Sequence, residues 1–150
     1  MTLPPQPIAY TLFCDDIREE RDHKYSAMGV YQTALVLNGD ELELPKFVAL
    51  TVVEIPSEAA GSQGFIQLVD RTEVLIKAEF DVPAPPDSGE NESLFLASMP
   101  IEAIPFAAKA GMELQVQFTV GNFRYVSPVL RVVRSDEVLS VEMQGKQIEK

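Results

Sequence analysis

Several residue types on which catalysis and cross-linking depend are scarce in this chain of 150 residues. It has one cysteine, Cys14, one histidine, His23, and no tryptophan. A single cysteine excludes a disulfide within the chain and is compatible with a reducing compartment. Cys14 continues the apolar run from Ile8 to Phe13, so we expect a buried, unreactive thiol.

Basic residues are also few. The chain has 12 Lys and Arg and 23 Asp and Glu, which give a formal net charge of −11. The electric field of such a protein repels phosphate backbones and anionic headgroups, so nucleic acid and membrane are poor partners. A protein with a basic surface is a better one. Residues 1–7 lack the pattern of a secretory signal, and no apolar run reaches the roughly 18 residues of a membrane span. We therefore expect a cytoplasmic protein of a bacterium or of a phage-infected host.

Familiar catalytic motifs are missing from the sequence, including Gly-x-Ser-x-Gly, His-Glu-x-x-His, the P-loop and the dinucleotide fingerprint. A dyad of Cys14 and His23 would have to form across a loop, without local support. Acidic pairs such as Asp15-Asp16 would need a deep cleft to act as glycosidase carboxylates, and a small domain of short strands offers little room for one. The sequence therefore predicts a protein that is not an enzyme and uses no cofactor.

Alternation of apolar and polar residues is the dominant pattern, and it is typical of strands with one buried face. It is clearest in two segments, whose apolar members are Val74, Ile76, Ala78, Phe80 and Val82 in the first and Met112, Leu114, Val116, Phe118 and Val120 in the second. Gly121-Asn122 then predicts a type II′ hairpin turn into a returning strand at residues 123–126.

Further strands are predicted at residues 8–14, 25–31, 64–69, 93–99 and 130–133. The segment Lys46 to Ile55 is apolar at nearly every position, which indicates a central strand covered on both faces. A buried helix is the alternative, but β-branched residues and the flanking Pro45 and Pro56 favour the strand.

Seven or eight such strands predict an all-β fold, an antiparallel two-sheet sandwich of Ig-like or C2-like type with Greek-key connections, or else a closed barrel. The alanine-rich stretch near residues 101–110 predicts at most a short helical turn, capped by Gly111. Residues 83–91 read as a loop rich in proline and acid. We expect one domain over residues 1–150, with flexible ends at 1–7 and 135–150.

A charged segment at residues 15–24 separates the first two predicted strands, and end loops are where binding groups usually lie. It predicts a binding surface with tyrosine anchors in a polar rim. The candidate residues are Asp15, Asp16, Arg18, Glu19, Glu20, Asp22 and Tyr25.

The same acids, with Asp87, Glu90 and Glu92, raise the alternative of a calcium site at one end of the sandwich. The spacing fits no calcium loop, and Arg18, Arg21 and Lys24 would partly neutralise the acids. We therefore predict no metal.

The motif Leu12-Phe13-Cys14-Asp15-Asp16-Ile17-Arg18, followed by Lys24-Tyr25-Ser26 and Gly29-Val30-Tyr31, resembles the opening of a family of small bacterial and phage β domains of unknown function. Leu44-Pro45-Lys46 and Ser127-Pro128-x-Leu130-Arg131-Val132 fit the later course of that family. The resemblance covers residues 8 to about 134. It implies a compact sandwich-like fold and no known activity.

These observations favour a non-enzymatic module that binds another protein through its end loops or a sheet edge. A phage virion or assembly component is one alternative. Another is an acidic mimic of DNA, whose carboxylates would occupy a basic site on a nucleic-acid enzyme.

Overall fold

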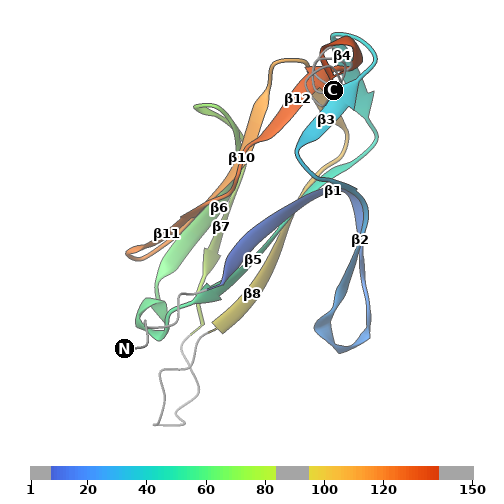
Figure 1. Cartoon of the computed structure of the whole chain (residues 1–150). Coiled ribbons are helices and arrows are strands. Elements are labelled where there is room, and N and C mark those ends of the chain that lie inside the picture. The colour runs from blue at the N-terminus through green and yellow to red at the C-terminus, as the bar shows by residue number, and fades with distance from the viewer. Residues whose placement is uncertain (1–7, 84–94, 139–150) are drawn as a thin grey trace, which may run out of the picture.

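The computed structural model describes residues 8–83 and 95–138, which are almost entirely β-structure (Figure 1). The described strands are β1 (Ala9–Glu19), β2 (Tyr25–Tyr31), β3 (Ala34–Leu37), β4 (Glu41–Leu44), β5 (Phe47–Ile55), β6 (Gln63–Asp70), β7 (Glu73–Asp81), β8 (Phe95–Ala103), β9 (Phe106–Lys109), β10 (Glu113–Val120), β11 (Phe123–Val126) and β12 (Leu130–Arg134). Short 3₁₀ turns occur at Arg21–His23 and Ser57–Ala59, and residues 135–138 form a helical turn. The prediction of an all-β fold is confirmed, with more strands than the seven or eight expected.

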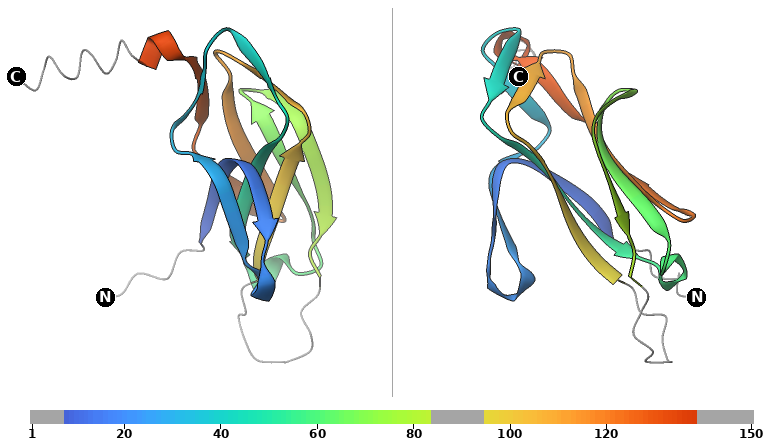
Figure 2. Two further views of the ribbon diagram at one scale, coloured as in Figure 1. Left: turned by 90° about the vertical axis from the view of Figure 1, so that its right-hand side faces the viewer. Right: turned by 180° about the vertical axis from the view of Figure 1, so that it is seen from behind.

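Two sheets face one another, and a two-stranded ribbon extends the structure at one end (Figures 1 and 2). Sheet A has the antiparallel order β2-β1-β5-β8. Sheet B has the order β3-β12-β10-β6-β7, and β11 also pairs with β10. The ribbon is formed by β4 and β9. The pairing of β3 with β12 is parallel, whereas every other pairing within the described residues is antiparallel, so the sandwich-like prediction holds with that exception.

Alternate residues of the central strands fill the space between the sheets. In β10, Leu114, Val116, Phe118 and Val120 are buried and their neighbours are half-buried, as the alternation predicts. The two-residue connection from β10 to β11 is also confirmed, because Gly121 has a φ of +55°, as the first position of a II′ turn requires.

Strand β5 is central, as predicted, because β1 pairs with one edge and β8 with the other. Val48 and Leu50 are buried on one face, and Phe47 and Val53 on the other. The ring of Phe47 stacks on that of Phe106 with centroids 4.7 Å apart. The ribbon strand β9 is thereby fixed to the core of the sandwich.

The prediction that Val74 faces the core is wrong. A register shift between Leu68 and Val69 interrupts the pairing of β6 with β7. Such a bulge reverses the alternation beyond it, so Val74 is exposed while Leu75 and Ile76 pack against the core.

The predicted helical turn near residues 101–110 is also wrong, because this stretch contains the end of β8 and all of β9. Phe106 and Ala108 are buried, whereas Ala107 and Lys109 are exposed. This is a two-residue period, which the small alanine side chains conceal in the sequence. Pairing with β4 stabilises the extended conformation.

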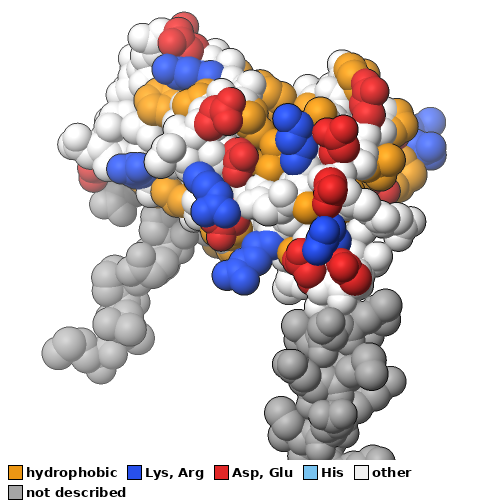
Figure 3. All heavy atoms as spheres, turned by 90° about the horizontal axis from the view of Figure 1, so that it is seen from above, with side chains coloured by type: hydrophobic (Ala, Val, Ile, Leu, Met, Phe, Trp, Pro, Cys, Tyr) orange, Lys and Arg blue, Asp and Glu red, His pale blue; other side chains and the backbone are white. Residues whose placement is uncertain are grey.

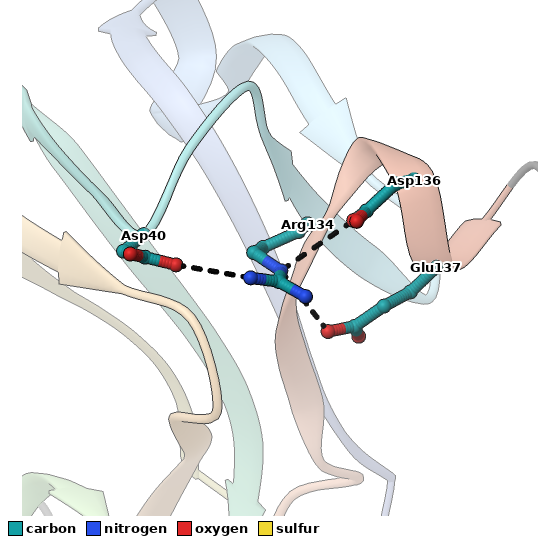
Figure 4. Close-up of polar contacts among 4 residues, drawn as sticks. All are labelled: Asp40, Arg134, Asp136 and Glu137. Carbon is teal, nitrogen blue, oxygen red and sulfur yellow. Dashed lines mark hydrogen bonds and ion pairs between the residues drawn. The ribbon is translucent and has the colours of Figure 1, made fainter.

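One arginine ties the helical turn at residues 135–138 to the connection between β3 and β4 (Figure 4). Arg134 Nη1 lies 3.3 Å from Asp40 Oδ1, and Arg134 Nε lies 3.4 Å from Asp136 Oδ1 and 3.5 Å from Glu137 Oε1. The hydrogen bond to Asp40 is the main cause that raises the pKa of Arg134. The loop predicted at residues 83–91, the flexible ends and the acids Asp87, Glu90 and Glu92 fall wholly or largely outside the described residues.

Candidate functional site

All seven predicted binding residues lie on one element, a β-hairpin that extends away from the other strands of sheet A (Figures 1 and 2). We call residues 15–29 the hairpin arm. The predicted residues belong to three parts of it: Asp15, Asp16, Arg18 and Glu19 to β1, Glu20 and Asp22 to the connection, and Tyr25 to the start of β2.

The prediction that residues 15–24 form a loop is wrong for its first half. β1 continues to Glu19 and pairs with β2 in register, with Asp16 opposite Met28 and Arg18 opposite Ser26. Both faces of the arm are largely open to water, so its side chains need not alternate between apolar and polar. Its backbone groups pair across the hairpin. Only the connection at residues 20–24 is non-strand, and within it Asp22 has a φ of +63°.

An ion pair joins the base of the arm to the body of sheet A. Lys46, just before β5, places its Nζ 2.7 Å from Asp16 Oδ1 and 3.6 Å from Glu102 Oε1 on β8. The hydrogen bond from Lys46 lowers the pKa of Asp16, and donation by the Ile17 N–H adds to the effect. The same pairing raises the pKa of Lys46.

A second contact lies at the point where β1 and β2 enter the arm. The hydroxyl of Tyr31 donates a hydrogen bond to Asp15 Oδ1. Burial of the phenol, and then this hydrogen bond, raise the pKa of Tyr31. Gly29 has a φ of +67°, and a Cβ there would overlap the Asp15 carboxylate. Gly29 therefore gives the Asp15 carboxylate room to lie over β2.

The predicted burial of Cys14 is confirmed, and its surroundings make it a poor nucleophile. It lies at the base of the arm, opposite Val30 and Val48. Burial and the nearby Asp15 raise the pKa of its thiol, which disfavours the reactive thiolate. The backbone of His23 belongs to the far end of the arm, roughly 15 Å or more along the hairpin at about 3.3 Å per residue. A dyad of these two residues is incompatible with this arrangement.

One pocket in the described part of the chain lies away from the predicted residues. A pocket of about 620 Å³ lies between β7, β8 and β9, with Leu75, Ile76 and Phe106 among its lining residues. None of the seven predicted residues lines it. Within residues 8–83 and 95–138, no three His, Cys, Asp or Glu side chains gather closely enough to hold a metal ion.

Lys46 and Glu102 are the site residues that sequence reasoning missed. Each lies far from residue 16 in the sequence, and no local spacing connects them. On the face seen from above, basic and acidic side chains are interspersed and do not form separate positive and negative patches (Figure 3). Within the described part of the chain, no helix has the length and apolar character needed to traverse a bilayer.

No protein-family model matches the chain, and comparisons with curated proteins and with solved structures find no significant match. The resemblance to the family of small bacterial and phage β domains therefore stays a prediction.

Acid should release the arm from Lys46. The pKa of Asp16 is below its ordinary value of 3.8, so its ion pair contributes fully above that pH and is lost as the pH falls through the lowered value. We expect the Ile17 amide resonance to titrate below pH 3.8 in two-dimensional NMR, and Asp16→Asn to remove that titration. Titration of Asp16 at or above its ordinary value would contradict the pairing.

Proposed function

We propose that this protein is a non-enzymatic β-sandwich module that binds another protein in the cytoplasm, and that the hairpin arm is its docking element. The observation that carries the proposal is the position of the arm: a paired hairpin that extends into solvent, presenting acids, bases and Tyr25 on one element. An isolated hairpin of two strands is marginally stable in water. The Asp16–Lys46 ion pair and the Tyr31–Asp15 hydrogen bond hold this one in a defined direction.

Preorganisation of this kind supports a binding role, because a docking element that is already ordered loses less conformational entropy when its partner arrives. The net charge of −11 favours a partner with a basic surface. Five acids and three bases between Asp15 and Lys24 provide charged groups for such a contact. The absence of familiar catalytic motifs from the sequence, together with the buried thiol at Cys14, also favours binding over catalysis.

Charge reversal near the tip of the arm tests the proposal. We expect Glu19→Lys/Glu20→Lys to lose the partners that the wild-type protein captures from lysate of its source cells, as measured by quantitative mass spectrometry. Both side chains are exposed, and the one hydrogen bond removed, from Ser26 Oγ to Glu20 Oε1, is itself exposed, so the fold should be unaffected. The matched control is Glu41→Lys/Glu43→Lys, which makes the same change in charge on the exposed positions of β4. Equal loss from both variants, or no loss from the arm variant, would contradict the arm as the docking element.

A further inference from the structure

Among the strands that the structure describes, the first half of β1 has a partner on one side only. β5 pairs with β1 from Ala9 to Cys14, but the pairing with β2 begins at Phe13, opposite Tyr31. After Tyr31 the chain leaves sheet A and enters β3 of sheet B. Within the described residues, the backbone of residues 9–12 therefore forms a free edge of sheet A.

The hydrogen bond at the start of β1 shows which backbone groups this edge presents. The carbonyl of Ile8 accepts from the Glu54 N–H at 2.7 Å, so Ile8 directs its backbone toward β5. Residues of an antiparallel strand alternate in direction, so the N–H and C=O groups of Ala9 and Thr11 point away from β5. Within residues 8–83 and 95–138, no backbone hydrogen bond outside the strand ladders reaches these groups.

Natural proteins usually guard such an edge with charge or proline. Residues 8–12 carry neither, although Pro4, Pro5 and Pro7 directly precede them in the sequence. Residues 8–12 are Ile, Ala, Tyr, Thr and Leu. In contrast, the edge strand β7 contains Lys77 and Glu79, and the edge strand β8 contains Pro100 and Glu102.

The surroundings of the free edge are apolar. Ile8 and Tyr10 are 57% and 46% exposed. A groove of about 350 Å³ lies alongside, with Leu12, Val30 and Val129 in its wall and without a charged residue among those that line it. An uncharged strand can therefore approach without desolvating an ion.

We infer that the free edge pairs with the same edge of a second copy of this chain. In an antiparallel arrangement about a two-fold axis at Tyr10, Ala9 lies opposite the second copy's Thr11, and Thr11 opposite the second copy's Ala9. Each of these pairs exchanges both of its main-chain hydrogen bonds. The second copy fits because it supplies an unpaired strand of the same length, the same alternation and the same lack of charge, and two-fold pairing is the commonest form of self-association.

Salt should strengthen this dimer. Each copy carries a net charge of −11, so the copies repel one another at long range while the contact itself holds no charge. The Debye length falls from about 14 Å at roughly 50 mM salt to about 4 Å at roughly 500 mM, which screens the repulsion. A complex with a basic partner would weaken under the same change, so the salt dependence separates self-association from the binding proposed for the arm.

Sedimentation velocity tests the inference with the protein alone. We expect a monomer–dimer equilibrium that shifts toward dimer with salt, and a dissociation constant raised about tenfold or more in Ala9→Pro, because proline cannot donate to the partner strand. Ala9→Ser keeps the N–H and should behave as wild type. Glu19→Lys/Glu20→Lys should still dimerise, so a failure of the docking proposal leaves this result intact.

A cross-link provides a second test that does not depend on tolerance of proline. At the axis, Tyr10 faces the second copy's Tyr10 as a non-hydrogen-bonded pair, the closest kind of cross-strand neighbours. We expect Tyr10→Cys to form a covalent dimer on mild oxidation. Leu96→Cys, at a 71% exposed position of β8, should stay monomeric, as should the wild type with its buried Cys14. A monomer at every concentration and salt, or cross-linking of Tyr10→Cys no faster than of Leu96→Cys, would overturn the inference.

Discussion

Replacing Phe47 by alanine should lower the free energy of unfolding by about 3–5 kcal/mol, the range for removal of a buried phenylalanine. Phe47 is fully buried at the start of β5. Its ring lies 4.7 Å from that of Phe106 and 6.0 Å from those of Phe13 and Tyr31, measured between centroids. The loss should be large because these three neighbouring rings belong to three different strands. The backbone of each strand is held by its pairing, so the rings cannot move together to fill the cavity that alanine leaves.

Urea unfolding followed by circular dichroism measures this effect as a change in the midpoint at constant slope. Val36→Ala is the matched control, since Val36 is 48% exposed on β3 and its truncation should cost less than about 0.5 kcal/mol. A loss below about 1 kcal/mol in Phe47→Ala would show that this ring does not join the sheet A core to the β4–β9 ribbon. Phe47→Leu should fall between the two variants because it keeps most of the buried volume.

The elements that could be predicted from the sequence are those whose burial follows a simple rule. In β10 one face is buried along the whole strand, so Leu114 to Val120 alternate without interruption. In β5 both faces are covered near its start, and the sequence from Phe47 to Val53 is correspondingly apolar except at Thr51. The burial of Cys14 could be predicted because this residue ends the apolar run that begins at Ile8.

The elements that were missed have environments that weaken these rules. β3, β4 and β9 have four residues each, too few for a period to be recognised without a turn signal such as the Gly121-Asn122 pair that predicted β11. The arm is open to water on both faces, so its β1 portion resembles a charged loop in sequence. The bulge depends on a partner strand: Leu75 is an extra residue of β7 between the pairs Leu68–Ile76 and Val69–Val74, and the alternation of β7 changes there.

The candidate surface could be predicted in its residues but not in its shape. Asp15, Asp16 and Tyr25 are adjacent in sequence to the other charged groups, and the hairpin keeps them together. What orients the hairpin is long-range: Asp16 meets Lys46 across 30 positions of sequence. The free edge of β1 is equally long-range, because it arises where β2 leaves sheet A for β3.

A polar side chain at the junction of β11 and β12 should contribute more to stability than its size suggests. β10 pairs with β11 from Gln117 onward and with β12 at Glu113 and Leu114, which leaves a gap in the ladder at Val116. Ser127 fills it: its N–H donates to the Val116 carbonyl at 2.9 Å, and its Oγ accepts from the Val116 N–H at 2.8 Å. Both residues are buried, so water does not replace these contacts.

Ser127→Ala keeps the main-chain bond but removes the acceptor for the Val116 N–H. A buried donor left without a partner costs about 1–3 kcal/mol, so we expect the free energy of unfolding to fall by about that amount. Ser98→Ala, at an exposed position of β8, should change it by less than about 0.5 kcal/mol. Hydrogen exchange separates the causes, because the Val116 amide should lose protection in Ser127→Ala more than the amides of β6 do. Uniform loss of protection across sheet B would instead mean that Ser127 acts through packing, and an unchanged stability would mean that the gap in the ladder is satisfied without its hydroxyl.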